Sequence, residues 1–306
     1  MNNEFIIFAG TANRSLAEKI AFEVGARLGN SLTEHFPDGE LSVRLNESVR
    51  GREIFIIQPT IPPVNENLIE LLAFADSCRR ASASYITAIV PYFGYARADK
   101  RNGRREPIMA RMVADLFEVA GIKHVVTVDV HTPQIEGFFH VPVDNLTAVF
   151  ALSEVLRERL SENAAVVAPD AGRVKMATAF AQQLKMPVVV LHKRRESGTE
   201  TAVTHLVGDV RGKACLIIDD MISTGGTIAE SVNALLDAGA KPGITVAATH
   251  GLFTSHARER LERESVGEIY VTDTVAVDER NWQKLRMVSI APLIAGAIRQ
   301  FLGDKK

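Results

Sequence analysis

Short runs of consecutive apolar residues alternate with longer amphipathic segments along the whole chain. We expect strands at Phe5–Ala9, Ile54–Ile57, Tyr85–Val90, His124–Val130, Ala165–Ala168, Val188–Leu191, Ala214–Ile218, Ile244–Thr249 and Ile269–Val271. Because these runs are continuous rather than alternating, the strands should be covered on both faces, as they are in parallel sheets. The pattern therefore predicts an α/β fold in which mainly parallel sheets are flanked by helices.

Helical periodicity fills most of the intervals between these strands. It predicts helices at Leu16–Leu28, Asn65–Arg80, Ile108–Ala120, Ala148–Leu160, Val174–Leu184, Ile228–Ala238 and Pro292–Leu302. Several of these segments are followed by a glycine, at Gly29, Gly121 and Gly239, and glycine readily adopts the left-handed conformation that closes a helix.

The length of the chain favours two domains. A chain of 306 residues exceeds the ~100–200 residues of one typical domain, and we expect the division near Val143–Ala148, after the proline-containing segment Val141–Val143. We expect an N-terminal domain over residues 1–146 and a C-terminal domain over residues 147–290. The last helical segment, residues 291–306, is a candidate for packing back on the first domain.

Composition and charge exclude several classes of function. The apolar share is 46%, which excludes global disorder, and 35 basic against 37 acidic residues give a net charge of −2. No overall basic field therefore exists for binding nucleic acid or an anionic membrane. Neither a membrane-spanning apolar run nor a secretory signal is visible, and Cys78 and Cys215 form no C-x-x-C pair. We expect a cytoplasmic protein, with local basic runs at Arg97–Arg105 and His192–Arg195 still to be explained.

The segment Leu216–Thr227 has the composition of a site for a phosphorylated sugar. An apolar strand leads into Asp219-Asp220, then into Ser223-Thr224-Gly225-Gly226-Thr227, and then into a helix. Paired glycines let the backbone approach an anion, the hydroxyls add donors, and a helix N-terminus favours negative charge. Adjacent carboxylates beside a phosphate raise each other's pKa, and sugar hydroxyls that donate to them would account for their presence.

Three further stretches contain residues suited to a nucleotide and a metal ion. Phe36–Glu40 reads as a turn with one aromatic and two acidic residues, and Pro91–Arg101 mixes aromatic residues with cations that can stack on a base and neutralise phosphates. Asp129 and His131, two residues apart, should project to one face at the end of a strand. Together with Asp170 they are candidates for holding a hydrated Mg²⁺.

The segment Leu216–Thr227 resembles the phosphoribosyl-diphosphate (PRPP) loop of the type I phosphoribosyltransferase-like fold. All the stretches together, in this order, resemble the ribose-phosphate diphosphokinase (PRPP synthetase) family over nearly the whole chain. The resemblance implies two similar type I phosphoribosyltransferase-like domains, the first without a PRPP loop. It also implies that the diphosphoryl group of ATP is transferred to the 1-hydroxyl of ribose 5-phosphate, which gives PRPP and AMP for nucleotide biosynthesis.

The resemblance assigns a role to each matching residue. ATP binding falls to Phe36, Asp38, Gly39, Glu40, Arg97, Ala98, Asp99 and Arg101, with the loop that contains Phe36 serving a neighbouring subunit. Magnesium is held by His131 and Asp170, and Asp170-Ala171-Gly172-Arg173 forms a diphosphate-binding loop. Ribose 5-phosphate is bound by Arg195, Asp219, Asp220, Ser223, Thr224, Gly225, Gly226 and Thr227.

The second basic run, His192–Gly198, is where the catalytic cations should lie. It leaves a strand and enters a polar segment suited to a mobile lid, and Lys193 and Arg195 match the family's catalytic pair. Phosphoryl transfer is catalysed mainly by positioning and by neutralising oxygens that gain charge. A closing loop can supply such cations only while ATP is bound.

Three departures from the family pattern stand out. Ala98 stands where many members have glutamine, Ser223 stands where many have aspartate, and the chain ends at Lys306 without the serine-rich tail of many members. That tail helps to form a regulatory site for phosphate and ADP, other parts of which match Ser48, Arg50, Ser82 and Arg104. We therefore expect weak or altered ADP inhibition, with inorganic phosphate a candidate activator.

Two other functions fit parts of the sequence. A phosphoribosyltransferase that consumes PRPP shares the Asp219-Asp220 loop but needs neither Phe36–Glu40 nor Arg97–Arg101. A non-catalytic regulatory subunit should have lost the lid cations or the metal ligands, all of which are present. A site completed by a neighbouring subunit requires a homo-oligomer, and the family commonly builds hexamers from dimers.

Overall fold

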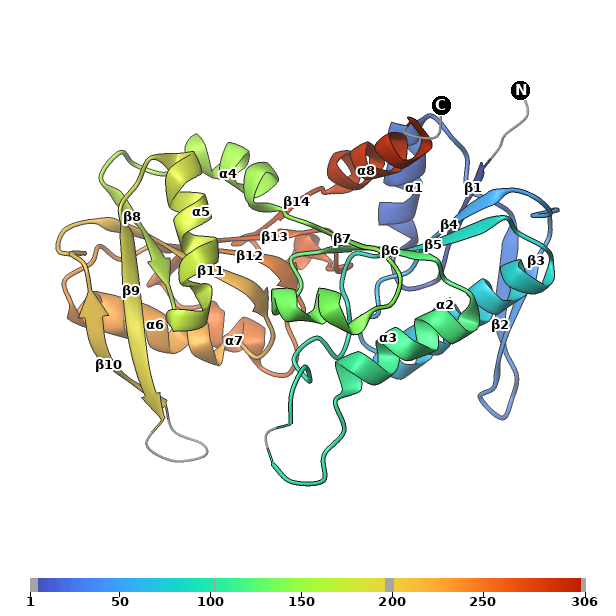
Figure 1. Ribbon diagram of the computed structural model, residues 1–306. Coiled ribbons are helices and arrows are strands. Elements are labelled where there is room, and N and C mark those ends of the chain that lie inside the picture. Colours follow the sequence, from blue (N-terminus) through green and yellow to red (C-terminus); the bar gives the residue numbers. More distant parts are fainter. Residues whose placement is uncertain (1–4, 102, 196–200, 304–306) are drawn as a thin grey trace. The chain divides into compact units, whose positions relative to one another are not determined.

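The computed structural model describes residues 5–101, 103–195 and 201–303 (Figure 1), with the backbone alone described at 193–195 and 201–204. The chain divides into two compact units. Unit 1 comprises residues 1–147, 274–276 and 291–306, and unit 2 comprises residues 148–273 and 277–290.

Unit 1 is built on a five-stranded parallel sheet. Its strands follow the order β1 (Phe5–Ala9), β4 (Glu53–Ile57), β5 (Tyr85–Val90), β6 (His124–Val128) and β7 (Val143–Leu146). Helix α1 (Arg14–Val24) packs with α8 (Ala291–Gly303), and α2 (Val64–Arg80) packs with α3 (Met109–Ala120). A separate antiparallel hairpin, β2 (Ser31–His35) and β3 (Leu41–Leu45), contacts α2.

The core of unit 1 is aromatic on both sides of its sheet. Phe8 of β1 meets Phe74 of α2 at a ring distance of 6.0 Å. From the other side, Phe301 of α8 packs edge-on against Phe55 of β4 at 5.7 Å, and its ring lies 5.5 Å from that of Tyr85. Helix α8, the last helix of the chain, is therefore part of the core of the first unit.

Unit 2 is built on a seven-stranded sheet that is parallel except at one edge. Its strands follow the order β10 (Thr201–Val207), β9 (Val188–Arg195), β8 (Ala164–Ala168), β11 (Ala214–Ile222), β12 (Ile244–Gly251), β13 (Val266–Thr272) and β14 (Leu285–Val288). Only the β9–β10 pair is antiparallel. The helices are α4 (Val149–Arg157), α5 (Val174–Leu184), α6 (Gly226–Asp237) and the short α7 (Ala257–Leu261).

The two units repeat one order of elements. Each series has a strand, a helix, a hairpin, a strand, a helix, a strand, a helix and two more strands. The first series is β1-α1-β2-β3-β4-α2-β5-α3-β6-β7, and the second is β8-α5-β9-β10-β11-α6-β12-α7-β13-β14. Each series is followed by one more helix, α4 after β7 and α8 after β14, and each of these helices belongs to the other unit. The hairpin β2–β3 is therefore the counterpart of the hairpin β9–β10.

The predicted fold class is confirmed, and so are all nine predicted strands and seven predicted helices; β1, β5 and α5 have the predicted bounds, and the ends of the others are shifted. Helix α1 ends earlier than predicted, because Gly25 rather than Gly29 adopts the left-handed conformation (φ 77°). Strand β11 runs to Ile222 instead of ending at Ile218, so Asp219 and Asp220 lie in a strand. The sequence pattern missed β2, β3, β7, β10 and β14, as well as α7.

Candidate active site

The two adjacent aspartates of β11 are buried and bound by one arginine. Asp219 is 8% exposed and Asp220 is 2% exposed. Arg173 donates from Nε to Asp219 and pairs through Nη2 with Asp220, each at 2.8 Å. The arginine lies in the short 3-10 helix Ala171–Arg173, whose N-cap Asp170 accepts a hydrogen bond from the backbone N–H of Arg173 at 3.2 Å. The predicted diphosphate loop and the predicted ribose-binding acids thus lie together.

The electrostatics of this cluster favour a ligand that donates hydrogen bonds. Burial, and then the neighbouring charge of Asp220, raise the pKa of Asp219 well above its ordinary value, and Arg173 only partly opposes this. Burial disfavours the charge on Arg173, but Asp220 and Asp219 outweigh it and raise the pKa of the guanidinium. Ligand hydroxyls that donate hydrogen bonds to these two carboxyl groups would favour their charged forms, which burial disfavours.

The residues after β11 form a turn that leads directly into helix α6. Gly225 is the N-cap with φ 73°, and α6 begins at Gly226, two residues before the predicted start. Gly226 and Thr227 therefore belong to the first helical turn, whose N–H groups have no acceptor within a helix. An added Cβ at Gly225 would lie 3.3 Å from Cγ of Leu261, so both the backbone conformation and the packing call for glycine here.

Two residues outside the loop hold it in place, and the sequence pattern did not single them out. Arg260 of α7 donates from Nη1 to the carbonyl oxygen of Thr224 at 2.9 Å. Thr254 bonds to Ser223 twice, through its N–H to the Ser223 carbonyl and through the two hydroxyls, both at 3.0 Å. The hydroxyl of Ser223 thus has a hydroxyl partner in Thr254. Arg260 lies in a short, charged segment, Ala257–Leu261, with no periodic signal.

The predicted lid residues lie at the end of a strand. Lys193 and Arg195 belong to β9, where the backbone pairs Lys193 with Val203 and Arg195 with Thr201 of β10. The expectation that the strand would end at Leu191 is wrong, because the hairpin continues the pairing. The remaining part of the predicted lid, Glu196–Gly198, lies outside the described residues.

In unit 1, the predicted ATP residues occupy a hairpin tip and a loop. Phe36, 53% exposed, lies at the β2–β3 turn, which is closed by hydrogen bonds between Phe36 and Glu40 and between Gly39 and Phe36. The Oδ1 atom of Asp38 accepts from the N–H of Glu40 at 3.1 Å. The aromatic ring is therefore presented to solvent rather than packed in the core.

The loop after β5 contains the other predicted ATP residues and is tied to neighbouring loops. Arg97 and Arg101 are exposed, whereas Ala98 and Asp99 are half-buried. The side chain of Asp99 accepts from the hydroxyl of Thr132 at 2.7 Å, so it lies beside the segment that contains His131. Loops that follow parallel strands meet at the carboxyl edge of a sheet, where ligands of α/β proteins bind.

The expectation that Asp129 and His131 project to one face of a strand is wrong. Strand β6 ends at Val128, and Asp129 adopts a positive φ of 39°, so the alternation of a strand does not apply. His131 belongs to unit 1 and Asp170 to unit 2. Among the residues that the structure describes, no group of three or more metal-ligating side chains of the His, Cys, Asp or Glu type is found.

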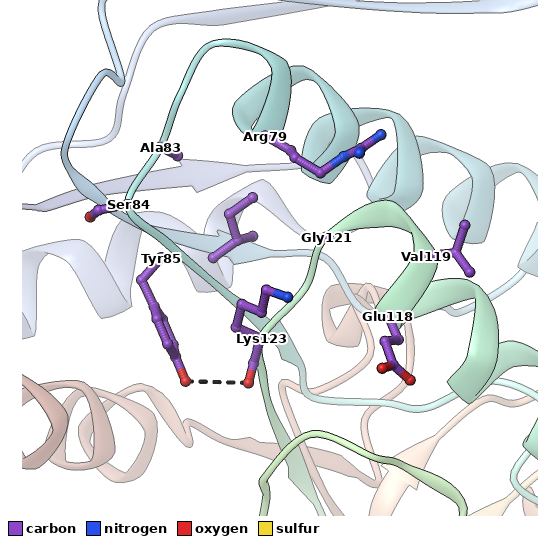
Figure 2. A pocket seen from close by; sticks show the side chains of 9 residues that line it. Arg79, Ala83, Ser84, Tyr85, Glu118, Val119, Gly121 and Lys123 are labelled. Atoms are coloured by element: carbon purple, nitrogen blue, oxygen red, sulfur yellow. Dashed lines mark hydrogen bonds between the residues drawn. The ribbon is translucent and has the colours of Figure 1, made fainter.

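Three of the four predicted regulatory residues lie on two joined loops. Ser48 and Arg50 precede Gly51, whose N–H donates to the carbonyl oxygen of Ser82 at 2.8 Å. The residues that follow Ser82 in the chain, Ala83, Ser84 and Tyr85, line a cavity of about 230 Å³ together with Lys123 (Figure 2), but none of the predicted regulatory residues lines it. Arg104 is exposed on the loop before α3.

The fold and the site geometry define a class: a two-unit α/β protein with an acidic strand end and a glycine-rich helix start suited to a phosphorylated sugar. The family model for the N-terminal domain of ribose phosphate pyrophosphokinase matches residues 5–121, and that for the phosphoribosyl synthetase-associated domain matches residues 199–305. The chain belongs to the ribose-phosphate pyrophosphokinase family.

Individual relatives match over nearly the full length. The ribose-phosphate pyrophosphokinase of Thermotoga maritima is 46% identical over 300 residues, which cover 97% of this chain and 95% of the relative. That of Listeria ivanovii is 43% identical over 305 residues, 97% and 96% of the two chains. The crystal structure of phosphoribosylpyrophosphate synthetase from Mycobacterium smegmatis has a TM-score of 0.91 at 42% identity and covers 98% of this chain and 99% of that one.

Proposed function

We propose that this protein transfers the diphosphoryl group of ATP to the 1-hydroxyl of ribose 5-phosphate, giving 5-phosphoribosyl 1-diphosphate and AMP. The observation that carries the proposal is the buried pair Asp219–Asp220, held by Arg173 directly before the glycine-rich start of α6. Family membership agrees with it. A membrane-spanning helix is found nowhere in the part of the chain that the structure describes.

In this proposal, unit 2 binds ribose 5-phosphate. The carboxylates of Asp219 and Asp220 accept hydrogen bonds from the ribose hydroxyls, which stabilises charge that burial disfavours. The first-turn N–H groups of α6 and the hydroxyls of Ser223, Thr224 and Thr227 bind the 5-phosphate at the positive end of the helix dipole. The loop Asp170–Arg173 receives the diphosphoryl group next to the 1-position.

Unit 1 supplies the residues for ATP. Phe36 and Arg97 offer an aromatic face and a guanidinium plane for adenine, and Arg101 offers a charge for the phosphates. The exposure of Phe36 supports a role outside its own core, in a site completed between subunits of a homo-oligomer. The loop between β4 and α2, which corresponds to the PRPP loop of unit 2, contains Pro59, Pro62 and Pro63. Prolines lack the N–H groups that an anion needs, so unit 1 has no second phosphate site of this kind.

Lys193 and Arg195 are the proposed catalytic residues. The 1-hydroxyl oxygen of ribose 5-phosphate forms a bond to the β-phosphorus while the bond from that phosphorus to the α–β bridging oxygen breaks. The hydroxyl gives up its proton and AMP leaves. Negative charge grows on the bridging oxygen and on the equatorial oxygens, and cations near them lower the barrier.

The donor set near the site suits Mg²⁺. This ion prefers oxygen ligands, keeps several waters and is usually held by one or two carboxylates together with substrate phosphates. Asp170 supplies a half-buried carboxylate, and its Oδ1 atom accepts a hydrogen bond from the backbone N–H of Arg173 at 3.2 Å. His131 is the second residue proposed to hold the ion. When bound, the ion neutralises phosphate charge.

Regulation by a small anion is proposed for the joined loops of Ser48, Arg50 and Ser82, together with Arg104. The hydrogen bond from Gly51 to Ser82 supports a shared surface for the first three residues. Inorganic phosphate is the proposed activator and the hexamer is the proposed assembly. Light scattering, and activity with and without phosphate, test these two points.

The central experiment measures AMP release from ATP and ribose 5-phosphate with Mg²⁺. We expect AMP in the wild type, and a kcat at least ~10²–10³-fold lower in Lys193→Ala with little change in ribose 5-phosphate binding, as for loss of a transition-state donor. A phosphoribosyltransferase would instead consume PRPP and a base, and a regulatory subunit would release no AMP. A near-normal kcat with a raised KM would refute the role of Lys193.

A further inference from the structure

A buried glutamate on α2 gathers donors from three separate segments of unit 1. Glu70 is 1% exposed. Its carboxylate accepts from the N–H and the hydroxyl of Thr11, the hydroxyl of Thr33 and the side-chain amide of Gln58, at 3.1, 2.6, 2.9 and 2.6 Å. A buried carboxylate with this many donors is a rigid junction, because each donor lost would leave part of the charge unsatisfied.

Two of the segments that meet at Glu70 lie at the carboxyl edge of the parallel sheet, and the third lies in the β2–β3 hairpin. Thr11 follows β1 and Gln58 follows β4, so both lie at the carboxyl ends of parallel strands. The junction is tight, since an added Cβ at Gly10 would come within 2.2 Å of Oε1 of Gln58. Thr33 differs from the other donors because it belongs to the β2–β3 hairpin rather than to the main sheet.

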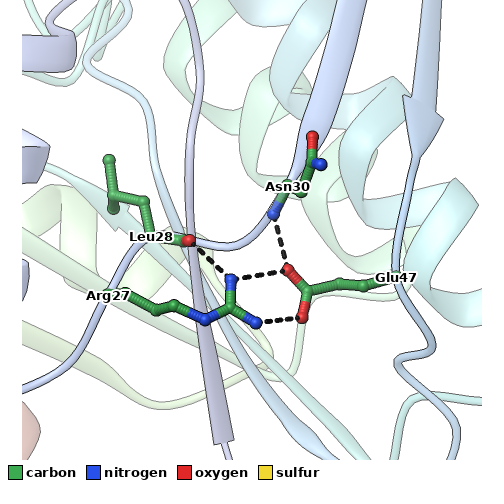
Figure 3. A network of polar contacts seen from close by, with 4 residues as sticks. All are labelled: Arg27, Leu28, Asn30 and Glu47. Atoms are coloured by element: carbon green, nitrogen blue, oxygen red, sulfur yellow. Dashed lines mark hydrogen bonds and ion pairs between the residues drawn. The ribbon is translucent and has the colours of Figure 1, made fainter.

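The hairpin is also held at its base, and Glu70 acts farther along it. At the base, Glu47 accepts from the N–H of Asn30 at 2.6 Å and pairs with Arg27 at 3.0 Å (Figure 3). Although burial acts in the opposite direction, these partners lower the pKa of Glu47. The Arg27 side chain is 69% exposed, so this clamp is open to solvent and weak.

Thr33 supplies a half-buried polar tie on β2, farther from the base than Asn30, while Val43 opposite it on β3 packs against the apolar core. Thr33 lies three residues before Phe36 in the same strand direction, about 10 Å along an extended chain. A small rotation of the hairpin about its base would move the tip by more than it moves Thr33. Fixing Thr33 to a buried carboxylate therefore fixes where Phe36, Asp38 and Glu40 point.

We infer that Glu70 is a positioning residue for ATP: through Thr33 it orients the hairpin whose tip binds the nucleotide. The inference rests on the proposed ATP-binding role of Phe36–Glu40. If Glu70 had a purely structural role, each of its hydrogen bonds would stabilise unit 1 in the same way. If Glu70 positions the hairpin, loss of its hydrogen bond to Thr33 should weaken ATP binding. Loss of its other hydrogen bonds should leave ATP binding unchanged.

The test compares two variants that each remove one hydroxyl from the same carboxylate. Thr33→Val cuts the tie to the hairpin, and valine is well suited to a strand. Thr11→Val cuts a bond of the same kind to the loop after β1 and is the matched control. Thr33→Ser keeps the hydroxyl, and Phe36→Ala tests the tip itself. For each variant, KM for ATP, KM for ribose 5-phosphate, kcat and the melting temperature are measured in the full-length protein.

We expect Thr33→Val to raise KM for ATP by about threefold to tenfold, the size of effect that loss of one typical intramolecular hydrogen bond has, with KM for ribose 5-phosphate unchanged. Thr33→Ser should restore the wild-type value, and Thr11→Val should stay within about twofold of it. Equal KM values for ATP in Thr33→Val and the wild type, with a raised KM in Phe36→Ala, would overturn the inference alone. An unchanged KM for ATP in Phe36→Ala would overturn the proposed role of the tip, and the inference with it.

Discussion

Replacing Arg173 by methionine removes the cation between two buried carboxylates. Its Nε and Nη2 atoms each lie 2.8 Å from an oxygen of Asp219 or Asp220, and the three side chains are 15%, 10% and 3% exposed. Methionine fills a similar volume, so the change is mainly electrostatic. Breaking a buried ion pair by removing one partner costs about 3–5 kcal/mol.

The lower end of this range applies at Arg173, because Asp219 can take up a proton. We expect the free energy of unfolding to fall by about 3 kcal/mol at pH 8, which corresponds to about 6–12 °C in melting temperature for a unit of this size. A loss of that size should be visible in a single unfolding curve. The size of this loss should also depend on pH, because Asp219 changes its charge with pH.

The sign of the pH dependence follows from that pKa. Because it is raised in the folded state, folding favours the protonated acid. The contribution of Asp219 to the free energy of unfolding is fully present below about pH 4, which is the pKa of this residue in the unfolded chain. The contribution is lost as the pH rises through the pKa in the folded state. Removing Arg173 raises the folded pKa further. The variant should therefore lose less stability at pH 6 than at pH 8.

Urea unfolding at the two pH values tests this prediction. The one tryptophan, Trp282, is 4% exposed and belongs to unit 2, so its fluorescence reports on the unit that contains Arg173. Arg280→Met is the control, because Arg280 pairs with Asp278 at 2.9 Å but is 86% exposed, and no measurable change is expected. A loss below about 1 kcal/mol, or one that is equal at both pH values, would refute the reasoning.

Four further substitutions, one of them a control, have definite expected outcomes. Asp219→Asn should abolish ribose 5-phosphate binding by calorimetry without lowering the melting temperature at pH 8, because it relieves repulsion from Asp220. Gly225→Ala should cost about 1–2 kcal/mol from its positive φ and also weaken sugar binding. Gly212→Ala, where φ is 68° and an added Cβ meets no described atom within 4 Å, should show the conformational cost alone. Phe301→Ala should cost about 2–4 kcal/mol in unit 1, seen as faster hydrogen exchange in β4 and β5 while Trp282 fluorescence is unchanged.

Apolar patterning predicted the central strands because both faces of those strands are buried. Strands β4, β5 and β8 are nearly uninterrupted runs of buried apolar residues. Such runs can be recognised in the sequence without knowledge of the contacts that the strands make. The hairpin strands Ser31–His35 and Leu41–Leu45 contain half-buried and exposed residues but no buried one, and β7 contains Asp144 and Asn145. These strands therefore lack the continuous apolar runs by which the central strands were predicted, although Leu41, Val43 and Leu45 alternate with polar residues as in a strand covered on one face.

The site was predictable where it is local in sequence. The order of residues from Leu216 to Thr227 specifies a strand, a turn and a helix start, and the structure has all three. The contacts of the acids were not predictable, because Arg173 is separated from Asp219 by 46 positions. The same holds for Glu70, which lies in a helix otherwise explained by its apolar face and meets Thr11 across 59 positions.

Helix α8 also bears on the order in which the chain completes its two units during synthesis. A ribosome delivers the N-terminal part first, and domains usually fold in that order. Here the first unit needs residues 291–303, which contain Phe301 and pack against α1, Phe55 and Tyr85. Every strand of unit 2 is synthesised before α8 emerges, so the unit that starts first is completed last. Until α8 is synthesised, the rings of Phe55 and Tyr85 lack the contact with Phe301 that they have in the folded unit.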